Sequence, residues 1–337
     1  MEAVRLTSHS GYDSLALKEE AIPEPGRYDV VIRVQAASLN YRDTIITKGL
    51  YGGPVKALGV PLSDGAGEVA AVGSDVTRVA VGDRVVANCH ATWISGPVLP
   101  EYHATSVGMT IDGMLAQYTV LPETGLIPIP DYMSYVEAAS LPCAAVSAWS
   151  ALNISEPLTP GQTVLVQGTG GVALFGLQIA RAFGARVLAI TSSDAKARTL
   201  TDLGAESVVN YRTHPEWSTK ILKLTAGVGV DKVVEIGGAG TIRQSVACAR
   251  IGGEIGIVGF VAQGSGGLTS DAVLARSLHL QGMTIGSRRN FEALLNAMSA
   301  GQIHPVIDSV YPFAEYKEAY RHLESGQHIG KIVISIE

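Results

Sequence analysis

Residues 163–196 read TVLVQGTGGVALFGLQIARAFGARVLAITSSDAK, and this stretch decides the fold of the chain. Its opening residues, 163–167, are mostly apolar or β-branched and predict a buried strand. A glycine-rich turn follows, then an apolar helical run that ends at Gly184, then a second strand over residues 186–191. This order predicts a βαβ unit whose turn, G-x-G-x-x-A, is typical of a dinucleotide-binding site.

The turn supplies the first group of candidate binding residues. Glycines let the backbone turn tightly and come close to a pyrophosphate, and the following helix presents N–H groups at the positive end of its dipole. Ala173 would let that helix pack near the strand. We therefore expect the dinucleotide to be held by Gly168, Thr169, Gly170, Gly171 and Val172.

The end of the second predicted strand indicates which dinucleotide is bound. Proteins that prefer NAD usually place Asp or Glu there to accept the ribose hydroxyls, whereas this chain has serines at 192 and 193. Asp194 comes later, where it is expected to start the next helix. Small hydroxyl residues leave room for a 2′-phosphate and can donate to it. We expect NADPH, bound by Ser192, Ser193, Lys196 and Tyr211; the alternative is a solvated helix start and a surface loop.

Composition and charge argue against several classes of protein. Apolar residues make up 47% and charged residues 17% of the 337 residues, which suits a compact enzyme of two domains. The net charge of −6, with no basic block, makes nucleic acid and anionic membranes unexpected partners. No apolar run nears the roughly 20 residues of a membrane span, and the N-terminus lacks the features of a signal peptide. The three cysteines share no short spacing, which argues against a disulfide framework or a zinc knuckle, so we expect a cytoplasmic protein.

The first and the later part of the chain differ in their sequence pattern. Residues 1 to about 125 are broken by Pro and Gly between short β-like runs, which is typical of a small irregular β domain. Further on, helical runs alternate with apolar strands, which predicts an α/β domain with a doubly wound parallel sheet. The tail is expected to fold back onto the first part. We therefore predict one domain of residues 1–125 and 300–337 and a nucleotide-binding domain of residues 126–299, with strands at 164–167, 187–190, 208–210, 232–236, 254–258 and 279–285.

Motifs along nearly the whole chain resemble the medium-chain dehydrogenase/reductase superfamily. Besides the nucleotide turn they are Pro-Glu-Pro-Gly at 23–26, Leu-Asn-Tyr-Arg-Asp at 39–43, Asp-Gly-Ala-Gly-Glu-Val at 64–69, Val-Gly-Asp-Arg-Val at 81–85, Leu-Pro-Cys-Ala at 141–144 and Gly-Lys-Ile-Val-Ile at 330–334. The resemblance implies a GroES-like β domain and an inserted Rossmann domain with a six-stranded sheet. It also implies a homodimer joined through the last parallel strand, here Leu278–Ile285.

Departures from the family pattern favour its zinc-free branch. Zinc alcohol dehydrogenases of this family carry a Cys where this chain has Asn40 and a His-Glu pair where it has Ser63 and Asp64, while their third ligand position matches Cys143. A catalytic zinc needs three protein ligands and an open position, and the four-cysteine structural zinc loop is absent as well. We expect that no metal is bound and that Cys143 is a small, buried apolar residue. The alternative is that Asp64 and Cys143 together coordinate a metal ion weakly.

The resemblance is strongest to quinone oxidoreductase-like and enoyl-reductase-like members, which reduce an activated C=C bond with NADPH. Hydride addition to the β-carbon pushes negative charge onto the carbonyl oxygen, so a metal-free site needs hydrogen-bond donors and a proton source. Asn40 occupies the former metal-ligand position, and Tyr51 resembles a tyrosine of the enoyl reductases, in a segment that is here two residues longer. We expect Asn40 and Tyr51 to be catalytic, the alternative for Tyr51 being a lid or packing residue. Arg42 and Asp43 are expected to form a structural ion pair.

Five further residues are expected to contact the cofactor because of their positions in the family pattern or after predicted strands. Ser147 matches a hydroxyl residue that lies near the phosphates or the nicotinamide in the family. Four residues follow predicted strand ends and are expected to flank the ribose and nicotinamide: Gly237, Val258, Gly259 and Phe260.

These observations predict a zinc-independent, NADPH-dependent oxidoreductase that reduces an α,β-unsaturated carbonyl compound or a quinone. Its expected partners are a small electrophilic substrate and a second copy of the chain. Two alternatives remain open: a metal-free NADP-dependent alcohol or ketone dehydrogenase, and a non-catalytic NADPH-binding protein.

Overall fold

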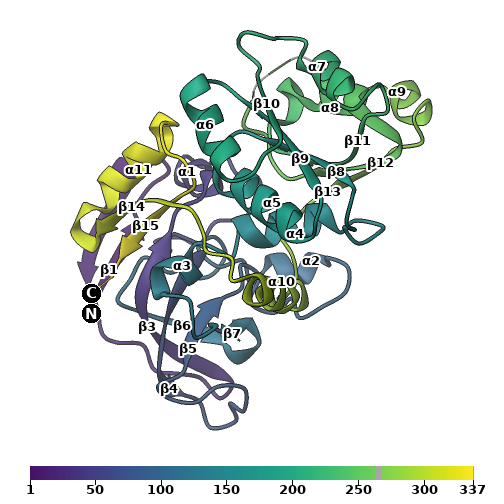
Figure 1. Cartoon of the computed structure of the whole chain (residues 1–337). Coiled ribbons are helices and arrows are strands. Elements are labelled where there is room, and N and C mark those ends of the chain that lie inside the picture. The colour runs from purple at the N-terminus through teal and green to yellow at the C-terminus, as the bar shows by residue number, and fades with distance from the viewer. Residues whose placement is uncertain (263, 265–266, 337) are drawn as a thin grey trace. The chain divides into compact units, whose positions relative to one another are not determined.

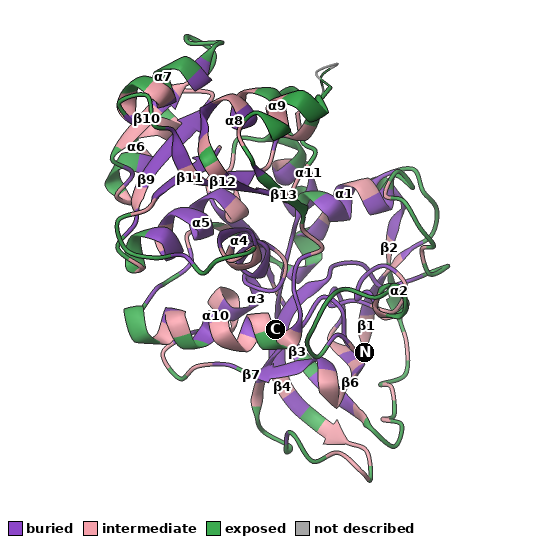
Figure 2. Cartoon of the chain, turned by 90° about the vertical axis from the view of Figure 1, so that its right-hand side faces the viewer, coloured by how far each residue is buried: buried purple, intermediate pink, exposed green. Residues whose placement is uncertain are grey.

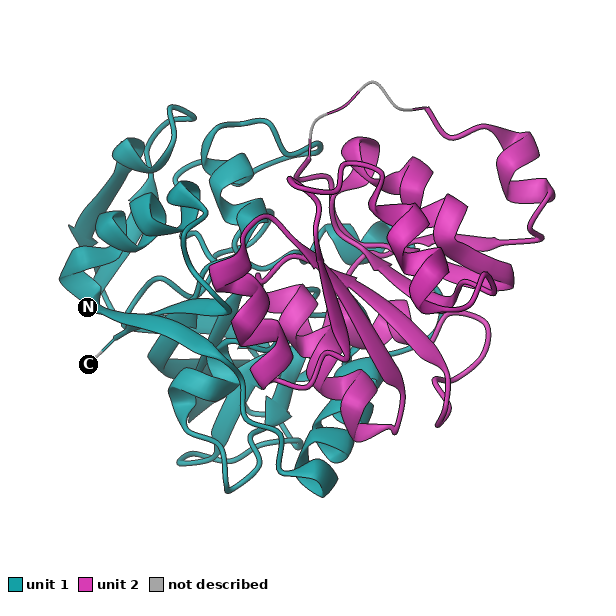
Figure 3. Cartoon of the chain, turned by 45° about the horizontal axis from the view of Figure 1, so that its top comes forward, with its two compact units in different colours: residues 1–144, 286–337 teal, residues 145–285 magenta. Residues whose placement is uncertain are grey.

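The computed structural model describes residues 1–262, 264 and 267–336, and the chain forms two compact units (Figure 3). Unit 1 comprises residues 1–144 and 286–337, and unit 2 comprises residues 145–285. Each unit has its own buried apolar core. None of the described helices is long and apolar enough to cross a membrane.

Unit 2 is built on a six-stranded parallel sheet, as predicted. Its strands are β8 (Thr163–Gln167), β9 (Arg186–Thr191), β10 (Ser207–Asn210), β11 (Val230–Glu235), β12 (Ala249–Ile257) and β13 (His279–Gly282). They lie in the order β10-β9-β8-β11-β12-β13, and every neighbouring pair is parallel. The chain therefore moves outward in one direction from β8 and in the other from β11. Open sheets of this kind bind ligands where the direction changes, at the carboxyl ends of the strands.

Helices connect these strands and cover both faces of the sheet, with α5 and α8 on opposite faces in Figure 1. The helices of this part of the chain are α4 (Ala144–Leu152), α5 (Gly171–Ala182), α6 (Asp194–Asp202), α7 (Trp217–Leu224), α8 (Ile242–Cys248) and α9 (Ser270–Leu274). The strands in the middle of the sheet are buried on both sides (Figure 2). This burial explains why they read as nearly continuous apolar runs.

Unit 1 is mainly β structure. A hairpin of β1 (Glu2–Leu6) and β2 (Leu15–Glu19) accompanies a seven-stranded sheet, in which β6 (Tyr118–Pro122) pairs with β3. The remaining strands follow the order β14 (Ile307–Pro312), β15 (Lys331–Ser335), β3 (Asp29–Ser38), β4 (Asp64–Val72), β5 (Arg84–Ala87) and β7 (Leu126–Pro128). Its helices are α1 (Tyr41–Thr47), α2 (Pro100–His103), α3 (Tyr135–Ala139), α10 (Arg288–Gly301) and α11 (Tyr316–Ser325). The tail folds back onto the first part, because β15 pairs antiparallel with β3.

The units divide at 144/145 and 285/286, whereas the sequence placed the divisions at 125/126 and 299/300. Two segments account for the difference. Residues 126–128 form β7, which is hydrogen-bonded to β5 of unit 1, and α3 packs against β3 and β4. At the other end, the N–H of Arg288 in α10 donates to the carbonyl of Trp93 in unit 1.

Candidate functional site

The glycine-rich turn after β8 has the form that a dinucleotide requires. Gly168 has φ of 81°, in the left-handed region, and an added Cβ at Gly168 or Gly170 would meet no atom within 4 Å. Helix α5 begins directly after Gly170, and no side chain caps it. Its first N–H groups therefore remain available to an anion, with the positive end of the helix dipole behind them. Thr169, Gly171 and Val172 complete this cradle, so the residues predicted here fit a pyrophosphate.

A buried polar network, which the sequence did not reveal, joins the ends of β8 and β11. The side-chain nitrogen of Gln167 donates to Glu235 at 2.7 Å and to Ser245 at 2.8 Å. The side-chain oxygen of Gln167 accepts from the backbone N–H groups of Ile236, at 3.0 Å, and Gly237, at 3.1 Å. Glu235 is fully buried and also accepts from the N–H of Gly238 at 2.9 Å and from the hydroxyls of Thr241 and Ser245. The network holds the backbone around Gly237 at the point where the sheet changes direction.

The residues predicted to read the 2′-phosphate are neighbours at the ends of β9 and β10. Asn210 pairs with Thr191, and the N–H of Tyr211 donates to the carbonyl of Thr191 at 2.9 Å. Ser193 is the N-cap of α6 and accepts from the N–H of Lys196 at 3.3 Å. Helix α6 begins at Asp194, as expected. This edge of the sheet thus carries hydroxyls, a lysine and a tyrosine near the end of β9.

The remaining cofactor candidates lie at the end of β12 and on α4. The N–H groups of Val258 and Gly259 donate to the carbonyl of Glu235, at 2.8 and 3.2 Å. Phe260, the next residue, is exposed. Ser147 is buried on α4. The structure therefore brings Val258 and Gly259 next to the Gln167 network, beside the nucleotide turn.

In unit 1 the predicted residue Asn40 lies at the start of α1 and is held from two sides. Its backbone N–H donates to the carboxylate of Asp43 at 2.7 Å, and its side-chain oxygen accepts from the ammonium of Lys331 at 2.6 Å. Lys331 also donates to the carbonyl of Leu39 at 2.6 Å and lies 3.7 Å from Asp64. The side-chain nitrogen of Asn40 is buried and has no hydrogen-bond partner among the described residues. Asn40 therefore offers an oriented, unused donor.

Arg42 and Asp43 do not form the expected ion pair in the described part of the chain. The buried Arg42 donates instead to Ser106 at 3.2 Å, and two of its nitrogens, Nε and Nη1, have no hydrogen-bond partner among the residues that the structure describes. Asp43 instead accepts from the backbone N–H of Asn40 at 2.7 Å, at the start of α1. Burial raises the pKa of Asp43 from 3.8 to about 7, against the lowering effect of Arg42.

Tyr51, the second predicted catalytic residue, lies beside this group. The guanidinium of Arg42 stacks over its ring, 5.4 Å from the centroid, a distance typical of a cation–π contact. Burial raises the pKa of Tyr51 above its ordinary value of 10.0, although Arg42 opposes the shift. Tyr51 therefore keeps its proton at neutral pH and can donate a hydrogen bond.

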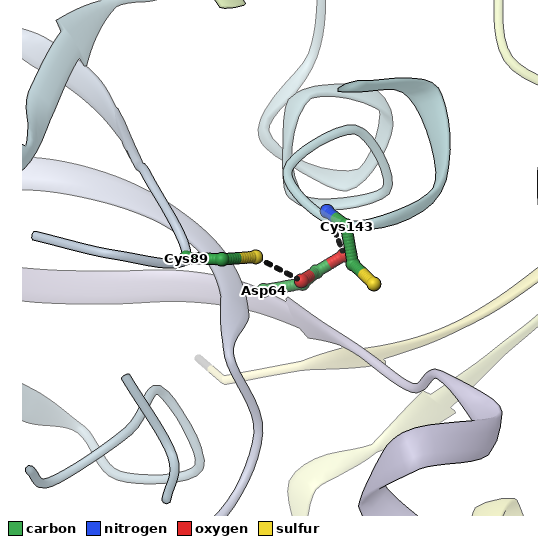
Figure 4. Close-up of side chains that lie close together, drawn as sticks. All are labelled: Asp64, Cys89 and Cys143. Carbon is green, nitrogen blue, oxygen red and sulfur yellow. Dashed lines mark hydrogen bonds between the residues drawn. The ribbon is translucent and has the colours of Figure 1, made fainter. Parts of the chain in front are cut away.

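A second cluster in unit 1 joins Asp64 to two cysteines, and Figure 4 shows the carboxylate between them. The thiol of Cys89 donates to one oxygen of Asp64 at 3.5 Å, and the backbone N–H of Cys143 donates to the other at 3.1 Å. Ser63 donates to the first oxygen at 2.7 Å. Cys143 is half-buried, so the expectation of a buried apolar residue was wrong. Its place is set by the backbone bond to a buried carboxylate.

Comparison with family models supports this architecture. Residues 26–131 match the alcohol dehydrogenase GroES-like domain, and residues 171–300 match the zinc-binding dehydrogenase domain. A zinc-type alcohol dehydrogenase-like protein of Schizosaccharomyces pombe is 42% identical over 349 residues, covering 99% of this chain and 100% of that protein. The human quinone oxidoreductase is 27% identical, covering 99% and 97%.

Solved structures of dehydrogenases and oxidoreductases share the fold of this chain. An NAD-dependent alcohol dehydrogenase superposes with a TM-score of 0.90 at 34% identity, and a mycobacterial protein complexed with NADPH with 0.84 at 26%, each covering the whole of both chains. A GroES-like unit combined with a dinucleotide-binding sheet defines an oxidoreductase that uses a nicotinamide cofactor. The chain belongs to the medium-chain dehydrogenase/reductase superfamily.

The names of the family model and of the S. pombe relative imply a zinc ion, and the candidate ligands in this chain are Asp64, Cys89 and Cys143. Two thiols and a carboxylate, with ligand atoms all within 4.8 Å of one another, are groups that zinc accepts. Positive charge is already supplied there, however, by the buried ammonium of Lys331 beside Asp64. Both oxygens of Asp64 also accept hydrogen bonds already, one from Ser63 and the thiol of Cys89 and the other from the backbone N–H of Cys143. As arranged, the cluster does not fit a zinc ion.

Proposed function

We propose that this chain is a zinc-independent, NADPH-dependent reductase of activated C=C bonds in α,β-unsaturated carbonyl compounds or quinones. The observation that carries the proposal is the side-chain nitrogen of Asn40, a buried donor with no hydrogen-bond partner in the described part of the chain, in a site that does not fit zinc. A metal-free site needs such a donor where negative charge develops on the substrate oxygen.

The choice of NADPH rests on the strand ends in unit 2. No acidic residue follows β9 at 192 or 193, where an NAD-binding protein would use one to accept the ribose hydroxyls. Ser192, Ser193, Lys196 and Tyr211 would instead surround a 2′-phosphate. The turn from Gly168 to Val172 would hold the pyrophosphate, and Gly237, Val258, Gly259, Phe260 and Ser147 are proposed to flank the rest of the cofactor.

When bound, NADPH supplies the hydride that adds to the β-carbon of the substrate. The C=C electron pair then moves toward the carbonyl, and the amide nitrogen of Asn40 donates to the oxygen that becomes negative. Tyr51, whose proton is retained at neutral pH, would donate to the same oxygen or deliver the proton that the α-carbon takes up. Removing one such donor typically lowers kcat by roughly 10²–10³-fold.

A panel assay of NADPH oxidation tests this proposal. The panel holds a 2-enal, an enone, a quinone and a saturated ketone, with NADH in parallel. We expect turnover of the unsaturated compounds with NADPH, and a large loss in Asn40→Leu and Tyr51→Phe. Turnover of the saturated ketone would identify an alcohol or ketone dehydrogenase instead. Tight NADPH binding without any turnover would indicate a binding protein.

We also propose a cytoplasmic homodimer formed through β13. This strand is the last of the sheet order, and its residues are mostly exposed. An unpaired strand edge is a template for a second strand. Mass photometry should give twice the mass of the 35.2 kDa chain. Placing like charges on the edge, with His279→Glu and Gln281→Glu together, should produce monomers; an unchanged dimer would exclude this edge.

A further inference from the structure

Lys331 is buried at the beginning of β15, with 3% of its side chain exposed. The preceding residue, Gly330, has φ of 88°, and an added Cβ would lie 2.2 Å from the carbonyl oxygen of Val306. The next residue, Ile332, accepts from the N–H of Leu39 at 3.1 Å. Backbone geometry on both sides therefore fixes Lys331 opposite the segment that leads into α1.

The hydrogen bonds of Lys331 decide which way the amide of Asn40 faces. An ammonium group only donates, and it lies 2.6 Å from the Asn40 side-chain oxygen. Reversing the amide would bring its NH2 group against the ammonium, donor against donor. The oxygen must therefore face Lys331, which turns the nitrogen toward the other side.

The nitrogen then has no partner of its own among the described residues, although it is buried. A buried donor left unpaired is costly, and rotation of the side chain cannot satisfy it without breaking the bond to Lys331. Asn88, another buried amide, is arranged in the opposite way: its nitrogen donates to the carbonyl of His90 at 2.9 Å, and its oxygen is the unpartnered atom. The unused donor is thus specific to the amide that Lys331 holds.

We propose that Lys331 is a positioning residue for reduction, which holds the Asn40 amide so that its N–H donates to the substrate oxygen. This inference rests on the proposed function. The ammonium also withdraws electron density from the amide oxygen, and chained hydrogen bonds of this kind strengthen the outer donor. Lys331 exchanges no proton with the substrate, and it replaces the charge, not the coordination chemistry, of a metal.

Kinetics of four variants test the assignment, with 2-cyclohexen-1-one and NADPH as probes. The variants are Lys331→Met, which keeps an unbranched side chain one heavy atom shorter and without the charge, Lys331→Arg, Asn40→Leu, and Lys331→Met combined with Asn40→Leu. We expect Lys331→Met to lower kcat at least about tenfold with an unchanged KM for NADPH, and Lys331→Arg to recover part of the loss. In the Asn40→Leu background, Lys331→Met should change kcat less than about twofold, because residues acting through one contact are not additive. Equal losses in both backgrounds, or no loss at all, would overturn the proposal.

A second measurement does not depend on turnover. In protein labelled with 15N-asparagine, the side-chain NH2 signals of Asn40 are assigned by their loss in Asn40→Leu. They should shift in Lys331→Met and stay in place in Lys18→Met, a matched change of an exposed lysine on β2. Unmoved signals in Lys331→Met would overturn the positioning role. If the wild-type protein reduces no panel compound, the proposed function fails, and these signals still decide whether Lys331 orients the amide. Should Lys331→Met not fold, as judged by circular dichroism, Lys331→Gln takes its place in both experiments.

Discussion

The side-chain amide of Gln167 donates to the carboxylate of Glu235 at 2.7 Å, across the two strands where the parallel sheet changes direction. Both residues end a strand, and both are buried. A buried carboxylate is stable only when hydrogen bonds replace the water it loses. Here those bonds come from the backbone and side chains that shape the nucleotide-binding edge.

Replacing this carboxylate should destabilise unit 2. Glu235→Ala leaves the hydroxyls of Ser245 and Thr241 and the N–H of Gly238 without their acceptor. We expect the free energy of unfolding to fall by about 2–4 kcal/mol, since unpaired buried donors cost roughly 1–3 kcal/mol each. Urea unfolding measures the loss. Glu206→Ala, which breaks a surface pair with Arg186, should cost under about 1 kcal/mol and serves as control; equal losses would show that the network adds nothing.

Lys196→Ala should weaken the binding of NADPH much more than the binding of NADH. A charged hydrogen bond to the 2′-phosphate contributes about 1.5–3 kcal/mol, so the Kd for NADPH should rise roughly 10- to 100-fold and the Kd for NADH little. Calorimetric titration gives both constants. Lys220→Ala, an exposed lysine on α7, should change neither. The same loss for both cofactors would remove Lys196 from the 2′-phosphate site.

Asp43 should make stability fall as the pH rises through weakly acidic values. Its pKa is 3.8 in the ordinary state and about 7 in the fold, where burial and Asp64 raise it and Arg42 and Lys331 lower it. The folded form therefore holds a proton that the unfolded form releases, and this contribution is complete below pH about 4 and lost as the pH passes about 7. Urea unfolding at several pH values should show this decline relative to Asp43→Asn. Parallel profiles for the two proteins would contradict the raised pKa.

Elemental analysis should find well below one zinc per chain in the purified protein. The reason is the ammonium of Lys331, which lies 3.7 Å from Asp64 and supplies the positive charge in that cluster. The decisive comparison is with Cys89→Ser and Cys143→Ser. One zinc per wild-type chain that is lost in both variants would show that the cluster is a metal site after all.

Local patterns predicted the parts of the structure that depend on neighbouring residues. The central strands β8, β9 and β11 of unit 2 were found because strands buried on both faces are nearly continuous apolar runs. The start of α6 was found because Ser193 and Asp194 are typical of a helix N-terminus. The sequence did not predict the boundaries of the two units. The strand β7 has only three residues, and its partner β5 lies some forty residues earlier in the chain, so no local pattern assigns β7 to unit 1.

The sequence by itself determined the class of fold, the nucleotide turn and the candidacy of Asn40 and Tyr51, because these follow from short motifs and their spacing. Only the tertiary structure joined Cys89 to Asp64, 25 residues away, and Lys331 to Asn40, 291 residues away. Such contacts depend on strand register, and a shift of one residue would turn each side chain to the other face of its sheet. The contact with Lys331 leaves the side-chain nitrogen of Asn40 without a hydrogen-bond partner among the described residues.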